Sequence, residues 1–244
     1  MKLAVEKLEA GYQGKTVVKD ISFTVEKGEF ISLIGPSGCG KSTVLKVLAG
    51  LLEPMAGTIK VDDEALRKGN SHFSYMPQND LLLDWYDILD NVCLYGKIHG
   101  KLQEARQQAL ADLKEFGLAG YEHAFPAQLS GGMRQRAAFL RTALCDSDIL
   151  LLDEPFGALD VITREDMQDW LNRMRQRLDR TTLLVTHDID EAIYLSDRIL
   201  ILGQRPASIT RIVDVRHPHK DRAWLYAQGE LRAAIHQELS HEVL

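Results

Sequence analysis

The fold is decided by the stretch Gly35-Pro36-Ser37-Gly38-Cys39-Gly40-Lys41-Ser42-Thr43. An apolar run, residues 30–34, precedes it, and a segment with helical character, residues 44–49, follows it. The stretch therefore lies in a glycine-rich turn between a strand and a helix, with the spacing Gly-x-x-x-x-Gly-Lys-Ser. This arrangement is typical of a loop that wraps around a phosphate group.

The residue types in this loop suit the binding of a phosphate group. Glycines let successive backbone N–H groups converge on an anion, and the N-terminus of the following helix adds positive potential. Lys41 is expected to reach the terminal phosphates, and the Ser42 hydroxyl is expected to contact Mg²⁺. The alternative, a flexible loop before an ordinary helix, is disfavoured because every fixed position is filled. The sequence therefore predicts a nucleoside triphosphate site.

Composition narrows the class of protein. The chain has 244 residues, which fits one large α/β domain with an inserted helical lobe. Its formal net charge of −6 gives no indication of a nucleic-acid partner. Three cysteines without metal-ligand or redox spacing favour a reducing cytosol over a disulfide framework. We recognise neither a signal peptide nor an apolar run of about 18–20 residues, so we expect any membrane role to depend on another polypeptide.

Changes in periodicity divide the chain. Residues 2–25 alternate between apolar and polar in short runs, which predicts antiparallel strands ahead of the glycine-rich loop. Residues 79–120 show helical periodicity, which predicts a helical subdomain inserted into an α/β core. Within a single domain, 1–244, we place the core at about 1–78 and 146–220, the helical subdomain at about 79–145, and a mostly helical tail at about 221–244.

Polar side chains follow two strongly apolar strands. The run 149–152 suits a strand buried on both faces, and it leads into Asp153 and Glu154. Because α/β folds bind ligands beyond the carboxyl ends of their strands, Asp153 is a candidate Mg²⁺ ligand and Glu154 a candidate to polarise the attacking water. His187 follows the run 181–186 and is a candidate contact for the γ-phosphate or that water. Taken alone, these residues also fit an acidic turn and a structural histidine.

Three further features are ambiguous when each is taken alone. Ser130-Gly131-Gly132 opens a long predicted helix and fits either an anion site or a plain serine N-cap. The apolar and aromatic cluster 81–86 fits subdomain core and an exposed docking patch about equally well. Tyr12 fits either packing or stacking on a base.

The order and spacing of these motifs resemble those of the ATP-binding cassette (ABC) ATPases of membrane transporters over essentially the whole chain. Residues 35–43 resemble the Walker A motif, 149–154 resemble Walker B, and 129–133 resemble the family signature, with Met133 where Gln is usual. The resemblance implies a P-loop NTPase core of mostly parallel sheet with flanking helices, an N-terminal antiparallel β-subdomain and an inserted α-helical signature subdomain. It assigns further roles: Tyr12 as the adenine-stacking aromatic, Gln78 as the Q-loop residue and Mg²⁺ ligand, Asp160 as the D-loop aspartate and His187 as the switch histidine.

The resemblance also implies an ATPase that works as a pair of cassettes. Each ATP, with Mg²⁺, would lie between one Walker A motif and the opposite signature, and its binding and hydrolysis would close and reopen the pair. One nucleotide would be served by one copy's catalytic and metal-binding residues: Lys41, Ser42, Gln78, Asp153, Glu154 and His187. Ser130, Gly131 and Gly132 would reach it from the other copy, and Asp160 would touch the partner's P-loop. The simplest partner is a second copy of this chain.

Transport follows from the same resemblance. Separate transmembrane permease subunits would hold the cassette at the cytoplasmic face of the inner membrane, with a solute-binding protein added in an importer. The cluster at 82–85 falls where a permease's coupling helix docks. Together with 129–136 and 155–160 it resembles cassettes of nitrate, sulfonate and taurine importers, although Asp84 replaces a usual proline. The alternatives are an exporter subunit, a soluble ABC ATPase of translation or DNA repair, and a degenerate cassette that only binds ATP.

Cys39 gives a separate hypothesis. It lies at a helix N-terminus inside the phosphate-binding loop, where a thiol's pKa is expected to fall. We therefore expect alkylation of Cys39 to block nucleotide binding, and bound ATP to protect the thiol.

Overall fold

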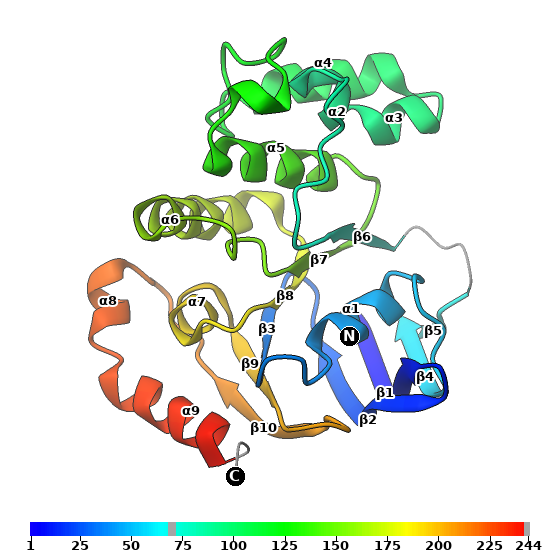
Figure 1. The fold of residues 1–244 in the computed structure, drawn as a ribbon, viewed down its shortest axis with the longest axis vertical. Coiled ribbons are helices and arrows are strands. Elements are labelled where there is room, and N and C mark those ends of the chain that lie inside the picture. The colour runs from blue at the N-terminus through cyan, green and yellow to red at the C-terminus, as the bar shows by residue number, and fades with distance from the viewer. Residues whose placement is uncertain (68–71, 242–244) are drawn as a thin grey trace.

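Two β-sheets and a separate layer of helices make up the molecule in the computed structural model, which describes residues 1–67 and 72–241 (Figure 1). The strands are β1 (Leu3–Tyr12), β2 (Lys15–Val25), β3 (Phe30–Ile34), β4 (Ala56–Val61), β5 (Glu64–Ala65), β6 (Phe73–Met76), β7 (Ile149–Asp153), β8 (Thr181–Val185), β9 (Arg198–Leu202) and β10 (Ile209–Asp214). The helices are α1 (Lys41–Leu48), α2 (Ile88–Val92), α3 (Leu94–Ile98), α4 (Leu102–Leu113), the 3-10 turn η1 (Pro126–Gln128), α5 (Gly131–Ala143), α6 (Val161–Leu178), α7 (Ile189–Leu195), α8 (Arg222–Tyr226) and α9 (Gly229–His241).

The larger sheet places the predicted site residues at one edge. Its strand order is β10-β9-β3-β8-β7-β6, and the five strands from β9 to β6 are mutually parallel. Strands β3, β8 and β7 are therefore neighbours, and their carboxyl ends meet at the same edge. The segments that follow them are the glycine-rich loop, His187 and Glu154. The topology thus brings together residues that are more than 100 positions apart in sequence.

The smaller sheet confirms the antiparallel strands predicted at the start of the chain. Its order is β2-β1-β4-β5, and β1 pairs antiparallel with both β2 and β4. Helix α1 packs between this sheet and the larger one, where it contacts β1, β2, β7 and β8. The helix that begins at the phosphate-binding loop is therefore held from two sides.

Alternate residues of the parallel strands feed two hydrophobic cores. Ile31 and Leu33 of β3 face α1 and the smaller sheet, whereas Phe30 and Ile34 face the helices on the other side. All five residues of β3, β7 and β8 are buried, which explains why these runs are apolar rather than alternating. The predicted α/β fold with a mostly parallel core is confirmed.

Helices α2 to α5 form the layer that Figure 1 draws above the sheets. This layer agrees with the helical periodicity predicted after residue 78; the subdomain boundaries given above remain a prediction. The rings of Phe116, Phe139 and Trp170 pack edge-on or tilted, with centroids 5.0–6.1 Å apart. Trp170 belongs to α6 and Phe139 to α5, so this aromatic cluster fixes the helix that carries Ser130 against α6.

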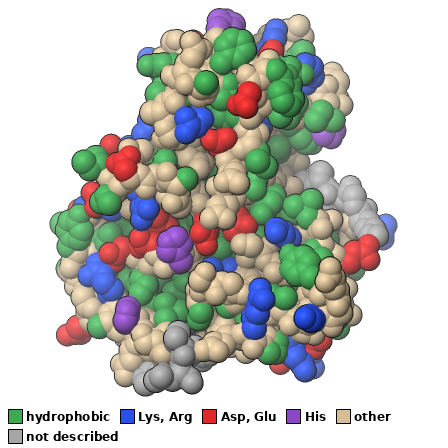
Figure 2. All heavy atoms as spheres, in the orientation of Figure 1, with side chains coloured by type: hydrophobic (Ala, Val, Ile, Leu, Met, Phe, Trp, Pro, Cys, Tyr) green, Lys and Arg blue, Asp and Glu red, His purple; other side chains and the backbone are tan. Residues whose placement is uncertain are grey.

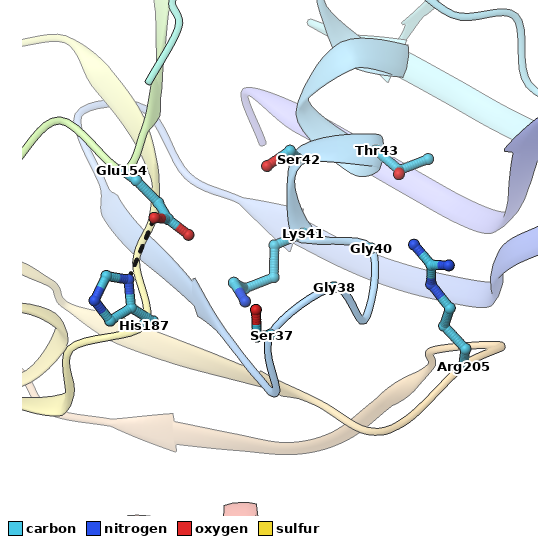
Figure 3. Close-up of a pocket in the computed structure, with 9 residues that line it drawn as sticks. All are labelled: Ser37, Gly38, Gly40, Lys41, Ser42, Thr43, Glu154, His187 and Arg205. Atoms are coloured by element: carbon cyan, nitrogen blue, oxygen red, sulfur yellow. Dashed lines mark ion pairs between the residues drawn. The ribbon is translucent and has the colours of Figure 1, made fainter. Parts of the chain in front are cut away.

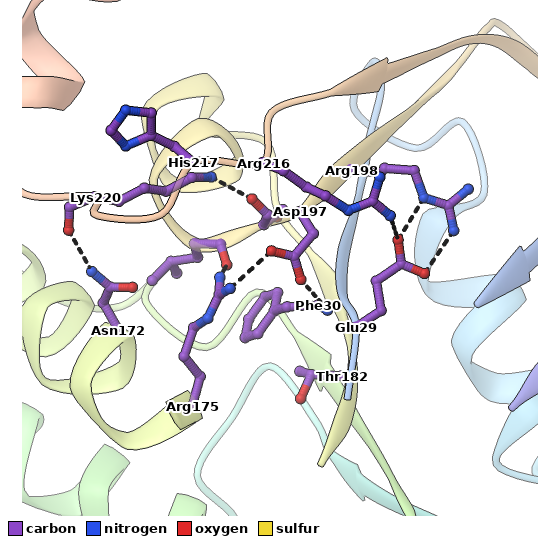
Figure 4. Close-up of polar contacts among 12 residues, drawn as sticks. Glu29, Phe30, Asn172, Arg175, Thr182, Asp197, Arg198, Arg216, His217 and Lys220 are labelled. Atoms are coloured by element: carbon purple, nitrogen blue, oxygen red, sulfur yellow. Dashed lines mark hydrogen bonds and ion pairs between the residues drawn. The ribbon is translucent and has the colours of Figure 1, made fainter. Parts of the chain in front are cut away.

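Charged residues tie the amino ends of two core strands together, at the edge opposite the candidate site (Figure 4). Glu29 precedes β3 and accepts hydrogen bonds from Arg198 at 2.6 and 2.7 Å and from Arg216 at 2.6 Å. Asp197 accepts from the Phe30 N–H at 2.8 Å and from Arg175 at 2.9 Å. The buried Glu29 and the half-buried Asp197 thus each have partners that offset the desolvation of the carboxylate.

None of the helices in residues 1–67 and 72–241 is long and apolar enough to span a bilayer.

Candidate functional site

A cavity of about 440 Å³ opens over the glycine-rich loop (Figure 3). Its walls come from the loop and α1, from the ends of β7 and β8, and from the turn after β9. The lining residues are Ser37, Gly38, Gly40, Lys41, Ser42, Thr43, Glu154, His187 and Arg205. In Figure 2, acidic side chains and a histidine gather in the middle of the face, between the helical layer and the sheets.

Close packing explains two of the loop's glycines. A Cβ on Gly40 would lie 2.6 Å from a methyl carbon of Val18, and the Gly40 φ of +129° is unfavourable for other residues. A Cβ on Gly35 would lie 2.7 Å from the Leu202 carbonyl oxygen. The loop is therefore pressed against β2 on one side and against the end of β9 on the other.

Lys41 is buried, and its side chain curls back over the loop. Its ammonium donates to the carbonyl oxygens of Gly35 at 2.9 Å and Pro36 at 3.1 Å. The positive charge thus lies inside the cradle formed by the loop's backbone. This position suits an anion with several oxygens bound between the ammonium and the N-terminus of α1.

Ser42 and Asp153, each a candidate Mg²⁺ ligand from the sequence, lie in direct contact. The Ser42 hydroxyl donates to Asp153 Oδ1 at 2.8 Å, and the Tyr75 hydroxyl donates to Asp153 Oδ2 at 2.9 Å. Burial and the Asp153 charge raise the pKa of Tyr75, so the phenol stays a donor. A hydroxyl and a carboxylate in direct contact form a hard oxygen pair at the edge of the phosphate cradle, and this donor set fits Mg²⁺.

Glu154 has two partners from different parts of the chain. Its Oε2 lies 3.3 Å from His187 Nδ1 and 3.3 Å from Gln78 Nε2. The backbone of Glu154 has a φ of +47°, and its N–H donates to the Val185 carbonyl of β8 at 2.9 Å. The structure therefore brings the three predicted catalytic residues together, while Gln78 lies just outside the residues that line the cavity.

The backbone beside His187 is braced by a buried carboxyl group. The Thr186 hydroxyl contacts Glu191 Oε2 and accepts from the Asp188 N–H at 3.0 Å. Gln168 of α6 donates to Glu191 Oε1 at 3.0 Å. Burial raises the pKa of Glu191 to about 7. Sequence reasoning missed Glu191, because an acidic residue in the first turn of a helix ordinarily signals only favourable helix electrostatics.

The structure contradicts the chemical hypothesis about Cys39. The thiol is buried, with 2% of the residue exposed, and its sulfur packs 2.9 Å from where a Gly35 Cβ would lie. Burial raises the pKa of Cys39 and outweighs the nearby positive charge of Lys41. The predicted reactive thiolate was wrong, because a position at a helix N-terminus does not reveal on which side of the loop the side chain lies.

Tyr12 and the cluster 81–86 are two of the features that the sequence left ambiguous. Tyr12 is 44% exposed at the end of β1 and lies outside the cavity lining, so its stacking role remains a prediction. In the cluster 81–86, Leu82 is part of the core whereas Trp85 is 71% exposed. The cluster is therefore divided: one residue packs inside and another is available for a partner.

Ser130, Gly131 and Gly132 do not line the cavity. Ser130 caps α5 by accepting from the Met133 N–H at 3.3 Å, and a Cβ on Gly132 would lie 2.6 Å from the Thr163 methyl carbon. Asp160 caps α6 by accepting from the Thr163 N–H at 3.1 Å. Residues 130–132 and Asp160 thus lie beside each other, outside the lining of the cavity over the glycine-rich loop.

Comparison with known proteins decides the family. The model of the family described as ABC transporter matches residues 18–157. This chain belongs to the ABC transporter family. As a member it is of the ATP-binding, ATP-hydrolysing type, and the predicted family resemblance is confirmed.

Individual relatives are similar over most of their length. The aliphatic sulfonates import ATP-binding protein SsuB 1 of Rhodococcus jostii is 50% identical over 85% of this chain and 80% of its own. The taurine import ATP-binding protein TauB of Yersinia pestis is 40% identical over 96% of this chain and 90% of its own. Among solved structures, the dimeric bacterial ABC transporter cassette MJ0796 has a TM-score of 0.75 at 28% identity, over 88% of this chain and 99% of that one.

Arg205 was not predicted. It lies in the turn between β9 and β10 and reaches the cavity from the side opposite Glu154 and His187 (Figure 3). The sequence around it, Gly203-Gln204-Arg205-Pro206, indicates only a turn. The signal that finds Arg205 is topological, because β9 lies directly beside β3 and its end meets the start of the phosphate-binding loop.

Proposed function

We propose that this chain is the energy-coupling ATPase subunit of an importer, and that it works as a dimer of two copies. The observation that carries the proposal is the separation of two half-sites on one chain. Lys41, Glu154 and His187 surround one cavity, whereas the signature at Ser130 lies elsewhere on the surface. Two copies related by a two-fold axis would place each signature over the other copy's cavity.

We assign the nucleotide's phosphates to the cradle over residues 35–43, with Lys41 as the charged contact. Ser42 and Asp153, with Gln78 approaching from β6, would hold Mg²⁺, which when bound neutralises phosphate charge. Tyr12 would stack on the adenine base from the end of β1.

Glu154 is the proposed group that orients and polarises the attacking water. Its Oε2 accepts a hydrogen bond from Gln78 and lies 3.3 Å from Nδ1 of His187, and these two neighbours orient the carboxylate. His187 lies on the same side of the cavity and is 58% exposed, so it is free to contact the terminal phosphate or that water. A carboxylate that polarises the attacking water, as proposed for Glu154, typically raises the rate by a factor of about 10²–10⁴.

Binding would close the dimer because ATP bridges the two half-sites. Ser130 and the N–H groups at the start of α5 would bind the terminal phosphate from the partner copy, with Asp160 beside them against the partner's loop. Once hydrolysis cleaves that phosphate from the nucleotide, the contact that stabilises the closed dimer over the open dimer is lost. The chain thereby converts hydrolysis into movement.

A transmembrane permease would receive this movement at the cytoplasmic face of the inner membrane. Trp85 is the proposed docking residue, because it is a large apolar side chain exposed directly after the loop that carries Gln78. The sulfonate and taurine import relatives support an importer of nitrate-, sulfonate- or taurine-like small solutes, with a solute-binding protein as a further component.

Phosphate release from Mg-ATP tests the enzymatic part. We expect the wild-type chain to hydrolyse ATP, and Glu154→Gln to reduce kcat by at least about 100-fold while ATP still binds. Glu165→Gln is the matched control, because Glu165 is an exposed glutamate on α6. A wild-type chain that binds ATP without hydrolysing it would instead favour a scaffold cassette.

Uptake tests the transport part. Cells that lack the chain should lose uptake of radiolabelled taurine or alkanesulfonate, and wild-type chain but not Glu154→Gln should restore it. Unchanged uptake would favour another solute, and faster loss of solute from cells carrying the wild-type chain would favour an exporter. ATPase activity with no membrane phenotype for any solute would favour the soluble alternative.

A further inference from the structure

Arg205 is a cation on the wall of the nucleotide cavity that the proposed function leaves without a role. Its side chain is exposed, and none of the hydrogen bonds and ion pairs found within residues 1–67 and 72–241 involves it. Most arginines of this chain that lie near carboxylates are paired, for example Arg198 with Glu29 and Arg222 with Asp169. Arg205 therefore keeps its donors available at the cavity.

The backbone on both sides of Arg205 is fixed against the same elements that fix the phosphate-binding loop. Leu202, at the end of β9, packs against Gly35 at the start of the loop. On the other side, the Ala207 N–H donates to the Val17 carbonyl at 2.9 Å, and the Lys19 N–H donates to the Ala207 carbonyl at 2.9 Å. The turn carrying Arg205 is thus anchored at both ends beside the loop.

Strand β2 is the shared support. Val17 and Val18 are the residues against which Gly40 is pressed, and Val18 also forms a β-bridge with Ala207. The loop that would bind phosphate and the turn that carries Arg205 therefore rest on the same two residues. Their relative position is set by backbone contacts, and only the side-chain torsions of Arg205 are left to adjust.

The position of Arg205 along the cavity indicates which part of a nucleotide it would contact. In Figure 3, Glu154 and His187 lie on one side of Lys41, and Arg205 lies on the other side, beyond Gly40. Arg205 also borders the outer side of the loop at residues 36–39. If hydrolysis takes place beside Glu154, the opposite side of the cavity faces the part of the nucleotide that remains after the terminal phosphate leaves.

We infer that Arg205 binds a phosphate group that ATP and ADP share, at the end of the phosphate chain away from the hydrolysed bond. This inference rests on the proposed function, because it takes the cavity to be the nucleotide site. A guanidinium is permanently charged and presents several N–H donors in one plane, which matches phosphate oxygens. With Lys41 it forms a pair of cations that holds the phosphate chain from both sides of the loop.

The inference makes a specific prediction about affinity. Because ATP and ADP would make the same contact, Arg205→Ala should weaken both by the same factor, about tenfold for the loss of one charge-assisted contact. Arg205→Lys should bind both nucleotides more tightly than Arg205→Ala, because the contact depends on charge. Arg205→Gln, which has no charge, should bind as weakly as Arg205→Ala. The ratio of ATP to GTP affinity should stay constant, since no base atom is involved.

Titration of fluorescent nucleotides in EDTA, where turnover is prevented, measures these affinities. The matched control is Arg211→Ala, because Arg211 lies on β10 in the same hairpin and pairs with Glu238 instead of facing the cavity. Equal losses of affinity for ATP and ADP support the inference, as does an affinity that falls more steeply with added salt in the parent than in Arg205→Ala, where only Lys41 of the two cations remains. Thermal melting of each variant verifies that the folded chain is being compared.

Two results would overturn the inference. Affinities equal to those of the parent would show that Arg205 makes no contact with the nucleotide. A loss confined to ATP would place Arg205 at the terminal phosphate and contradict its assigned end. A parent chain that binds neither nucleotide, with Mg²⁺ as well as in EDTA, would be a different failure, because it would overturn the proposed function itself.

Discussion

The Nδ1 atom of His187 lies 3.3 Å from Oε2 of Glu154, although the two residues follow different strands and are 33 positions apart. The contact exists because β7 and β8 are adjacent and parallel, so that the residues beyond their carboxyl ends share one edge. Gln78 approaches the same carboxylate oxygen from the end of β6, the next strand along. Three consecutive strands thus each deliver one polar side chain to a single point.

This geometry predicts different effects for the two residues. Glu154→Gln keeps the shape but removes the charge, so kcat should fall by at least about 100-fold with little change in the affinity for ATP. His187→Ala should lower kcat while Glu154 keeps its contact with Gln78. Steady-state phosphate release with a parallel binding titration separates the two parameters. An unchanged kcat in both variants would remove this pair from the mechanism.

The separation of the two half-sites predicts complementation between damaged copies. Lys41→Ala spoils the cavity and Ser130→Arg spoils the signature, so each protein alone should be nearly inactive. A mixed dimer contains one site with both defects and one site with neither. Mixing should therefore restore hydrolysis to a substantial fraction of the wild-type rate, measured as phosphate release against the mixing ratio. A mixture as inactive as its components would show that both halves act within one chain.

The raised pKa of Glu191 is expected to make the stability of the folded chain depend on pH. Its folded-state pKa is raised to about 7, above the value near 4.5 expected in the unfolded chain, chiefly by burial and also by the charge of Asp188. The folded state therefore holds the proton more tightly, and stability falls as pH rises from about 5 through 7. Glu191→Gln should remove this fall, on the order of 2–3 kcal/mol in the free energy of unfolding.

Urea unfolding of wild type and Glu191→Gln at pH 5 and pH 8 measures that difference, with the exposed Glu165→Gln as control. Parallel pH profiles for wild type and Glu191→Gln would contradict the assignment. Because Glu191 braces Thr186 next to His187, the substitution should also alter the pH profile of kcat more than it alters the affinity for ATP.

Glu29 is expected to stabilise the folded chain at the edge of the sheet opposite the candidate site. Burial alone would raise its pKa, but the hydrogen bonds from Arg198 and from the Glu26 backbone outweigh burial, and the pKa is lowered. The contribution is therefore present above the unfolded pKa and is lost as pH falls into the acid range. Glu29→Ala should cost about 3 kcal/mol in the free energy of unfolding at pH 7, because it removes the carboxylate that pairs with Arg198 and leaves that guanidinium with the Thr24 carbonyl as its hydrogen-bond partner.

Denaturant unfolding of Glu29→Ala measures this cost, and Glu26→Ala is the matched control because Glu26 is largely exposed. The folded fraction of Glu29→Ala should bind ATP normally, since Glu29 lies at the amino ends of the strands. Equal stability of the two variants would show that the cluster in Figure 4 contributes little.

Those parts of the site that consist of consecutive residues could be predicted from the sequence. The loop 35–43 could be predicted because its spacing has one common physical use. Ser42 and Asp153 could each be named as candidate Mg²⁺ ligands, and the structure adds their direct contact. The fold class followed in the same way, from fully apolar runs that only a doubly covered sheet can bury.

Three features could not be predicted, each for a physical reason. The side chain of Cys39 turns into the core, and local sequence does not reveal which side of a turn is buried. Leu82 and Trp85 are equally apolar, yet only tertiary packing decides that one is core and the other is exposed. Arg205 reaches the cavity through the pairing of β9 with β3, a contact between distant segments that no motif records.

The most direct test of the account is the mass of Glu154→Gln with and without Mg-ATP, measured by light scattering. We expect a monomer of 27.5 kDa without nucleotide and a dimer of twice that mass with ATP, but not with ADP. Adding Ser130→Arg to Glu154→Gln should prevent the dimer while leaving ATP bound. A Glu154→Gln chain that binds ATP and remains a monomer at every protein concentration tested would contradict the claim that ATP joins two half-sites from two copies.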